Sequence, residues 1–391
     1  MNARWKRVFL ASMTAIAAIG SQATWAADGV HYKISGFGTL GGAKTDTDET
    51  GFRTSVSQLK GADKQGFDLG VDSKAAVQGT VFLPQDFAIT AQILGIRRDE
   101  VDFDMGFEWL YAQYTGVPGL DLKVGRVVLP AFLVSDSRLV GYASPWLRVP
   151  PLVYSMMPMS HVDGGQATYR HAIGGAVVSA QLTYSSSTHT NAYSTAGVPL
   201  GPTTLYLPNT TSGQADNVVG LNATLEWGDW TARISQVRAN DKLVSTVVLP
   251  AAYGGAQYDT PLNFKDKFQE IGLQYDNGSL VFMSEYVTRK TDPAVQHAKA
   301  WYVGGGYRFG ALMPYAIVSQ FEVTKSTVSS IDPKTKGLAA GLRYDFASNL
   351  ALKGEWARYR NYNTYIFTDA ASPSAKGKNV NVMSVALDFV F

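Results

Sequence analysis

The sequence predicts an all-β fold, a transmembrane antiparallel β-barrel of sixteen strands. Stretches of about ten residues alternate between large apolar and polar side chains, the pattern of a strand with one lipid-facing side. The connections between these stretches alternate between short and long, and a membrane barrel sorts its turns and loops in this way. Beyond the N-terminal segment, no apolar run reaches the roughly 18 residues that a membrane-spanning helix needs. A helical membrane protein is therefore excluded.

Residues 1–26 are predicted to be a cleaved signal peptide. Three basic residues precede an apolar run over residues 8–20, and small residues surround Trp25. The run is too short to cross a bilayer as a helix. We therefore expect cleavage after Ala26 and export of residues 27–391, which form the barrel.

The composition of the mature chain excludes several classes of protein. Removing the signal peptide takes away three of the 34 Lys and Arg residues, which leaves 31 against 32 Asp and Glu residues. This balance gives no basic excess for a nucleic-acid partner. Cysteine is absent, so the chain is not a small disulfide-linked scaffold. The 38 glycines and 12% aromatic residues are typical of many strands and turns.

The final strand shows the alternation most clearly. Met383, Val385 and Phe389 point to one face, and Ser384 and Asp388 point to the other. The same period of two marks the other segments, so one face of each strand is expected to meet lipid. The predicted strands are residues 31–41, 74–83, 87–97, 107–116, 120–128, 165–172, 176–185, 217–227, 230–238, 267–276, 279–289, 298–309, 313–323, 336–346, 350–360 and 380–391.

The connections predict the orientation in the membrane. Short connections carry turn residues, as in the run Asp276, Asn277 and Gly278. The longer ones are polar, such as residues 185–216 and 239–266. We expect the short turns on the periplasmic side and the long loops outside.

Aromatic residues near the strand ends predict an interfacial girdle, because rings with a polar edge favour the membrane interface. These residues are Tyr184, Trp227, Trp230, Tyr275, Tyr307, Phe309, Tyr344, Phe346, Trp356 and Phe389.

The first and last strands are expected to pair. A free strand edge in hydrocarbon would leave amides and carbonyls unpaired, at several kcal/mol each. Residues 31–41 supply the partner, so Phe391 is predicted to end a closing, lipid-facing strand.

These features resemble a Gram-negative outer-membrane porin of the general-diffusion family. The sequence "VGR" at 124–126, the long connection over 128–164 and "GGQATYRH" at 164–171 are similar to the porin segment whose third external loop folds into the barrel. The terminal Phe391 resembles the assembly signal of outer-membrane proteins. The resemblance implies a homotrimer in contact with outer-membrane lipid and lipopolysaccharide. It also implies passive diffusion of small hydrophilic solutes and ions.

The resemblance also suggests a charged constriction. Arg126 and Arg170 match strand arginines of the family, whereas the loop lacks the acidic tip of the best-known porins. Opposite charges across a narrow waist would create a transverse field, with an anion bias as the resulting hypothesis. The alternative is that these charges pair along the wall or lie outside in solvent. The candidate residues are Arg97, Arg98, Arg126, Arg138, Arg148 and Arg170 with Asp136 and Asp163.

Other functions remain as alternatives. A substrate-selective channel would need a binding track, and Phe37, Trp109 and Tyr111 are inward-facing candidates. A barrel with a plugged lumen is disfavoured, because a barrel of sixteen strands leaves an aqueous channel.

Neither catalysis nor a cofactor is expected. The five histidines show no zinc spacing, and no G-x-S-x-G motif accompanies them. A G-x-G-x-x-G pattern starts at Gly36, but a polar loop follows it where a nucleotide site needs a helix. These glycines are expected to allow close packing instead. Carboxylates over residues 99–104 are attributed to a solvated loop rather than to a Ca²⁺ or Mg²⁺ site.

Overall fold

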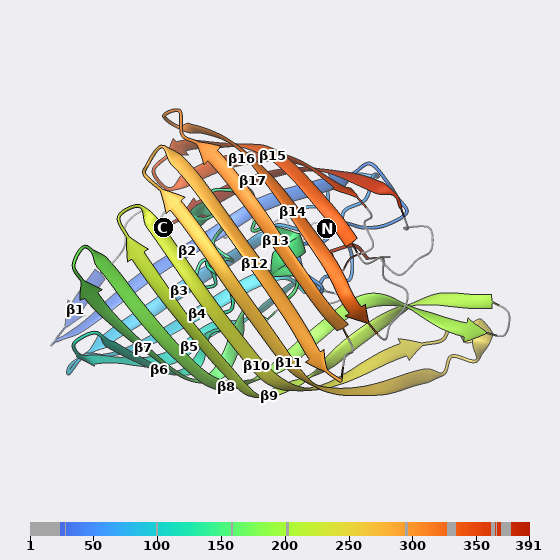
Figure 1. The fold of residues 1–391 in the computed structure, drawn as a ribbon, viewed down its shortest axis with the longest axis horizontal. Helices are drawn as coiled ribbons and strands as arrows, with labels where there is room; N and C mark the ends of the chain where they lie inside the picture. Colours follow the sequence, from blue (N-terminus) through green and yellow to red (C-terminus); the bar gives the residue numbers. More distant parts are fainter. Residues whose placement is uncertain are drawn as a thin grey trace.

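The computed structural model describes residues 24–27, 29–98, 101–157, 159–200, 203–293, 296–326, 334–360, 364, 366–368 and 377–391. Strands β2 to β17 form one closed antiparallel barrel of sixteen strands, in which each strand pairs with the next and β17 pairs with β2 (Figure 1). The predicted fold class is confirmed.

The barrel strands are β2 (Val30–Thr45), β3 (Lys74–Leu83), β4 (Phe87–Arg98), β5 (Val101–Val117), β6 (Leu120–Val128), β7 (His161–Ile173), β8 (Ala176–Leu200), β9 (Thr203–Trp227), β10 (Trp230–Val248), β11 (Gln257–Asp276), β12 (Leu280–Asp292), β13 (Gln296–Tyr307), β14 (Leu312–Ser326), β15 (Lys334–Ala347), β16 (Leu350–Arg360) and β17 (Asn379–Val390). A further short strand, β1 (Thr24–Ala27), pairs with the start of β2. The helical segments are η1 (Gly141–Ala143), α2 (Pro151–Tyr154) and η2 (Ala251–Tyr253).

Strands β8 to β11 are much longer than predicted. The connections predicted over 185–216 and 239–266 are mostly strand, because the β8–β9 and β10–β11 hairpins keep their pairing far beyond the barrel rim. Figure 1 shows these two hairpins projecting past the other strands. Their many Ser, Thr, Tyr and Val residues suit extended backbone although they are polar overall.

The acidic segment after β4 also differs from the prediction. Strand β5 begins at Val101, because Phe103 and Met105 continue its apolar alternation. Asp102 and Asp104 therefore belong to a strand, while Asp99 and Glu100 lie outside the described residues.

The closing seam, where β17 pairs with β2, explains why β2 has glycines. The backbones of Phe391 and Gly36 exchange two hydrogen bonds of 2.9 and 3.0 Å. The Phe391 ring lies over Gly36 and the Phe389 ring over Gly38, so that a Cβ atom at either glycine would collide with the ring. The C-terminal aromatics therefore need these glycines in order to lie flat on the barrel.

The outer face is apolar. Val77, Ile93, Leu182, Leu225 and Ile271 are all exposed and alternate with inward-facing residues. Aromatic pairs lie near the short-turn ends, such as Trp230 with Tyr275 (ring centroids 4.6 Å apart) and Tyr307 with Phe309 (4.7 Å). No helix within the described residues is long and apolar enough to span a membrane.

Candidate functional site

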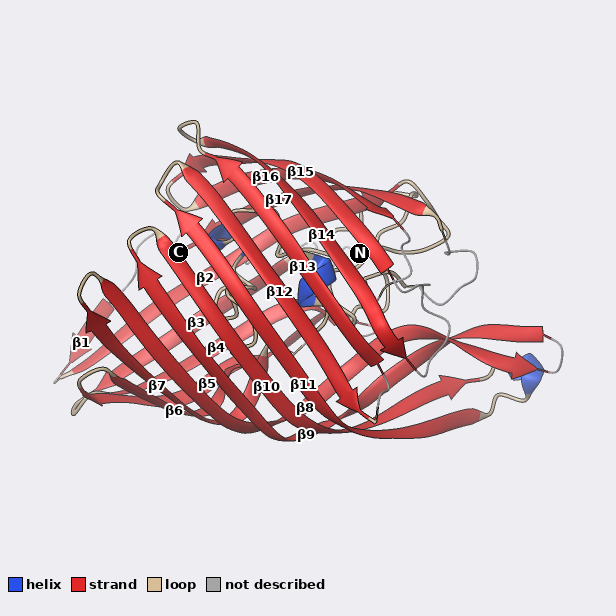
Figure 2. Cartoon of the chain, viewed as in Figure 1, coloured by secondary structure: helices blue, strands red, loops and turns tan. Residues whose placement is uncertain are grey.

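The segment between β6 and β7, residues 129–160, lies inside the barrel. It contacts inward-facing side chains of β10, β12 and β14 to β16, and also Phe37 of β2 on the other side. Figure 2 shows its helix α2 enclosed by the strands. We refer to residues 129–160 as the inner loop.

Apolar packing holds one side of the inner loop against the wall. Phe132 stacks on Tyr154 (centroids 4.2 Å apart) and meets the edge of Phe268 from β11 (5.2 Å). Trp146 packs on Tyr315 of β14 (5.2 Å). These residues belong to one buried cluster that includes inward side chains of β11 to β14. The loop is fixed there because its apolar residues find a second apolar surface inside the barrel.

Lys353 of β16 anchors the backbone of the inner loop. Its ammonium donates to the carbonyl oxygens of Gly141 (2.8 Å), Ser144 (2.7 Å) and Trp146 (3.0 Å). It also forms an ion pair of 2.9 Å with Asp388, and both side chains are fully buried. Buried loop carbonyls need such donors, since an unpaired buried carbonyl is costly.

Arg148 fixes the tip of the inner loop. It makes a bidentate ion pair with Asp72 (2.8 and 2.7 Å) and a longer contact with Glu355 of β16 (3.4 Å). Glu355 also accepts from the Tyr315 hydroxyl at 2.9 Å. Burial opposes the charge of Arg148, but Asp72 and Glu355 outweigh it and raise the pKa of Arg148.

Glu285 of β12 accepts hydrogen bonds from both the inner loop and the barrel wall. Its carboxylate accepts from the Tyr154 hydroxyl (2.6 Å), the Leu133 amide (2.9 Å) and the Tyr302 hydroxyl (2.9 Å). Burial and the neighbouring carboxylate raise the pKa of Tyr154 well above its usual value, so its hydroxyl keeps the proton that it donates.

A second segment meets the inner loop, and sequence reasoning did not identify it. Phe52 is fully buried, stacks on Tyr359 of β16 (centroids 5.8 Å apart) and contacts Phe367 (5.9 Å). The Arg148 guanidinium lies 5.2 Å from the Phe52 ring centroid. Residues 50–72 therefore cover the inner loop tip near β16. The only sequence signal is a few apolar residues in an otherwise polar connection.

Three predicted arginines lie in or beside this region. Arg97 pairs with Asp68 at 2.8 Å, and Arg98 pairs with Glu108 at 3.2 Å. Arg138 donates to the Met157 carbonyl at 3.2 Å, and burial lowers its pKa.

Arg126 and Asp163 lie elsewhere. They were predicted at the constriction, yet they pair with each other (2.7 and 2.9 Å) on the outer face of the barrel. The physical reason is strand parity, because Arg126 shares its face with the exposed Leu122 and Val124. This parity was readable from the sequence.

Arg170 faces inward at the short-turn end of β7. Its nearest acid is Glu226 of β9, at 3.9 Å, and both side chains are largely exposed. The structure therefore does not bring Arg170 together with Arg148.

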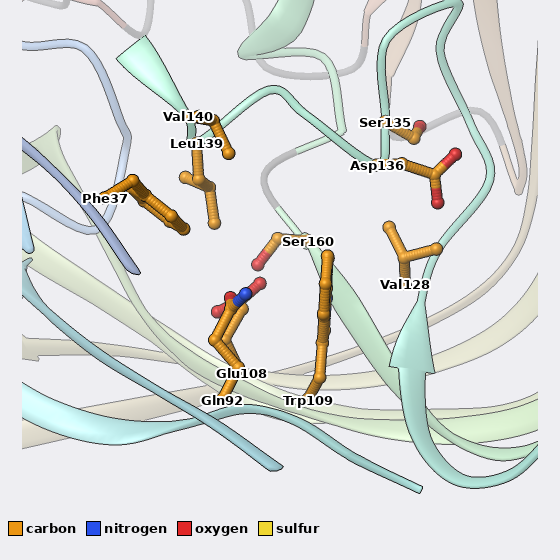
Figure 3. Close-up of a pocket in the computed structure, with 10 residues that line it drawn as sticks. All are labelled: Phe37, Gln92, Glu108, Trp109, Val128, Ser135, Asp136, Leu139, Val140 and Ser160. Carbon is orange, nitrogen blue, oxygen red and sulfur yellow. The ribbon is translucent and has the colours of Figure 1, made fainter. Parts of the chain in front are cut away.

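Asp136 of the inner loop borders a cavity with two residues of β5, Glu108 and Trp109 (Figure 3). A bulge opposite Gln92 and Ile93 interrupts the register of β5, which lets the adjacent Glu108 and Trp109 both reach this cavity. Glu108 was missed because strict alternation predicts opposite faces. The lining residues are Phe37, Gln92, Glu108, Trp109, Val128, Ser135, Asp136, Leu139, Val140 and Ser160.

Away from the apolar cluster, neutral polar side chains form hydrogen bonds between neighbouring strands of the wall. Gln92 donates to Gln78 at 2.9 Å between β4 and β3, and Gln166 donates to Thr183 at 3.1 Å between β7 and β8. Similar bonds join Asn222, Gln181 and Thr168 across β9, β8 and β7. Amide and hydroxyl side chains thus face the lumen where the inner loop leaves it open. Among the described residues, no group of three or more His, Asp or Glu side chains could hold a metal ion.

Comparison with known proteins agrees with this architecture. Residues 231–364 match the family model described as Gram-negative porin. OmpT of Vibrio cholerae, as expressed in the outer membrane, superposes with a TM-score of 0.57 at 14% identity, covering 94% of this chain and 100% of that one. The anion-selective porin of Comamonas acidovorans gives 0.52 at 13% identity (93% and 100%). OmpF of Salmonella typhi, in complex with daunomycin, gives 0.55 at 13% identity (94% and 100%). No curated protein sequence matched.

The fold and the family match define the class of protein: a β-barrel pore of the outer membrane. The resemblance predicted from the sequence is confirmed: residues 231–364 match the Gram-negative porin family, and the chain has the barrel fold of solved outer-membrane porins. Both findings favour a channel over an enzyme.

Proposed function

We propose that the chain is a passive-diffusion pore for small hydrophilic solutes and ions, narrowed by the inner loop and without a catalytic step. The observation that carries this proposal is the set of buried bonds that hold the loop across the barrel, from Lys353 and Glu285 on the wall to Arg148 at the tip. A loop held at several points keeps a constant width, as a diffusion pore requires.

The charges that set ion selectivity are proposed to be those beside the open part of the lumen. Asp136 is exposed on the inner loop, and Glu108 with Arg98 lies across the cavity from it. Arg97 and Arg138 lie near these charges. Arg148 is proposed to affect the pore indirectly, because its ion pair with Asp72 fixes the position of the inner loop. Arg126 and Asp163 are assigned to the outer face instead, and Arg170 to the periplasmic vestibule.

The test is single-channel recording in a planar bilayer under a salt gradient. Asp136→Asn removes a lumen carboxylate, so the reversal potential should move toward anion selectivity, whereas Arg126→Ala should leave it unchanged. A wild-type protein that inserts but carries no current would refute the pore. An Arg126→Ala shift as large as that of Asp136→Asn would refute the assignment of charges.

A channel selective for neutral solutes is the second candidate. The amide and hydroxyl wall of β3, β4 and β7 to β9 supports it, since such groups exchange hydrogen bonds with polyhydroxylated solutes. Phe37 is buried beneath the inner loop, so the predicted aromatic track lacks one of its members. Liposome swelling with sugars and amino acids of equal size distinguishes the two, because simple diffusion gives equal rates.

We further propose a signal peptide over residues 1–26 and a homotrimer. The trimer is supported by likeness to one solved form of Vibrio cholerae OmpT, folded in vitro, which is described as a trimer (TM-score 0.57, 14% identity). N-terminal sequencing of the exported protein and its mass in detergent test both proposals.

A further inference from the structure

The cavity in Figure 3 combines an aromatic ring with acidic side chains. It lies between the inner loop and strands β4 and β5, and its empty space of about 250 Å³ is partly open to solvent. This volume suits a small solute rather than a drug-sized one. Phe37 packs on apolar residues of the inner loop at one side, and Glu108, Trp109 and Asp136 line the cavity with it. The cavity therefore offers apolar surface and negative charge together.

A β-bulge aims both the acid and the ring of strand β5 into this cavity. The outward residues Phe107 and Leu110 are exposed on the outer face, and Glu108 and Trp109 between them both point inward. Bulges often re-aim a side chain beside a functional site. Figure 3 shows the Trp109 ring edge-on, with Glu108 on one side and Asp136 on the other. Trp109 is half-buried, so part of its ring surface meets the cavity.

The positive groups near the cavity are engaged elsewhere. Glu108 is almost fully buried and pairs with Arg98 at 3.2 Å, and His161 Nδ1 lies 3.3 Å from the same carboxylate. The charges of Glu108 and Arg98 therefore offset each other. Arg138 donates to the Met157 carbonyl at 3.2 Å and does not line the cavity.

Asp136 is the lining charge that remains. It is exposed, and among the residues that the structure describes no basic side chain forms an ion pair with it. A carboxylate beside an indole ring favours a cation, because the face of the ring carries negative charge. The apolar side formed by Phe37 disfavours a hydrated inorganic ion, which would lose water there. An organic cation with methyl groups suits all three surfaces.

We propose that this cavity is a binding subsite for small organic ammonium ions of the quaternary, methylated type. The Trp109 ring binds the methylated ammonium, Asp136 balances its charge, and the apolar side beside Phe37 covers the rest of the solute. Such a site is weak, because a solute that passes through a pore must also leave it. The proposal rests on the proposed pore function and names a class of solute that the pore favours.

The experiment is single-channel recording in potassium chloride with choline chloride added as the probe. Bound choline should interrupt the potassium current, and the frequency and length of the interruptions give its Kd. Loss of a cation–π contact weakens binding about two- to thirtyfold, which is the change expected for Trp109→Leu. Trp109→Phe keeps a ring and should bind more tightly than Trp109→Leu. Loss of an exposed charge partner weakens binding by up to about fivefold, which is the change expected for Asp136→Asn.

The matched controls change the same residue types away from the cavity. Trp227→Leu removes an exposed ring of the outer face, and Asp259→Asn removes an exposed carboxylate of the β10–β11 hairpin. Both should keep the wild-type Kd for choline. An equal loss in Trp227→Leu and Trp109→Leu, or a wild-type Kd in Trp109→Leu, would overturn the subsite.

A further arm separates charge from shape. Dimethylbutanol, in which a carbon atom replaces the choline nitrogen, should interrupt the current far less than choline and equally in wild type and Asp136→Asn. Interruption as strong as that by choline would assign the cavity to neutral solutes and overturn the proposal. A wild-type channel that conducts potassium chloride without choline interruptions also overturns it and leaves the pore intact, whereas a protein without current refutes the pore itself.

Discussion

Arg148, on the inner loop, and Asp72, on the connection between β2 and β3, form a bidentate ion pair of 2.7 and 2.8 Å in which both side chains are almost fully buried. The pair joins the two segments that cover the lumen, since Phe52 of the second segment also lies against Arg148. Four predictions concern this arrangement and the barrel around it.

Replacing Asp72 by Ala should loosen the inner loop. Removing one partner of a buried ion pair leaves a buried charge and typically costs about 3–5 kcal/mol. We expect a lower unfolding temperature and a larger, noisier single-channel conductance. Asp48→Ala is the matched control, because Asp48 pairs with Lys64 at the exposed surface. Identical behaviour of the two variants would show that the Asp72 pair does not position the loop.

Lys353 and Asp388 should show strong energetic coupling. Lys353→Met leaves three loop carbonyls without their donor and leaves Asp388, which still accepts from the Thr39 hydroxyl, without its counter-charge, so we expect a loss on the order of 3–5 kcal/mol. The double variant Lys353→Met with Asp388→Leu removes the orphaned charge and should lose less than the sum of the two single changes. Denaturant unfolding in lipid vesicles measures this cycle. Strict additivity would mean that the pair makes no net contribution.

The hydrogen bond that the Tyr154 hydroxyl donates to Glu285 should be lost at high pH. Because burial raises the pKa of Tyr154 above its unfolded value near 10, its contribution to stability is complete below that value. The contribution falls as the pH rises above about 10 toward the higher folded pKa. We expect the unfolding temperature to drop over this range, and less steeply in Tyr154→Phe. A parallel decline in both proteins would assign the effect to other groups.

Gly38→Val should weaken barrel closure. A side chain at this position collides with the Phe389 ring, and overpacking of this kind costs about 1–3 kcal/mol. Gly79→Ala is the control, since a Cβ atom at Gly79 meets no other atom within 4 Å. Thermal unfolding of the folded barrel, followed by its gel mobility, should show a loss only for Gly38→Val. Equal stability of both variants would show that the seam adjusts freely.

The sequence by itself determined the barrel, its number of strands and which face of each strand meets lipid. These properties are local, because a side-chain period of two and a turn residue such as Gly278 act within a few positions of the chain. The same parity would have placed Arg126 on the outer face, beside Leu122 and Val124, had it been applied to that residue.

Only the tertiary structure decided which charges meet. Asp72 and Arg148 are 76 residues apart and Lys353 is more than 200 residues from the loop carbonyls that it binds. No local pattern selects such partners, because barrel closure and loop packing bring them together. The bulge that turns Glu108 toward the lumen and the long pairing of β8 with β9 are likewise set by the neighbouring strand, which a single segment of sequence does not specify.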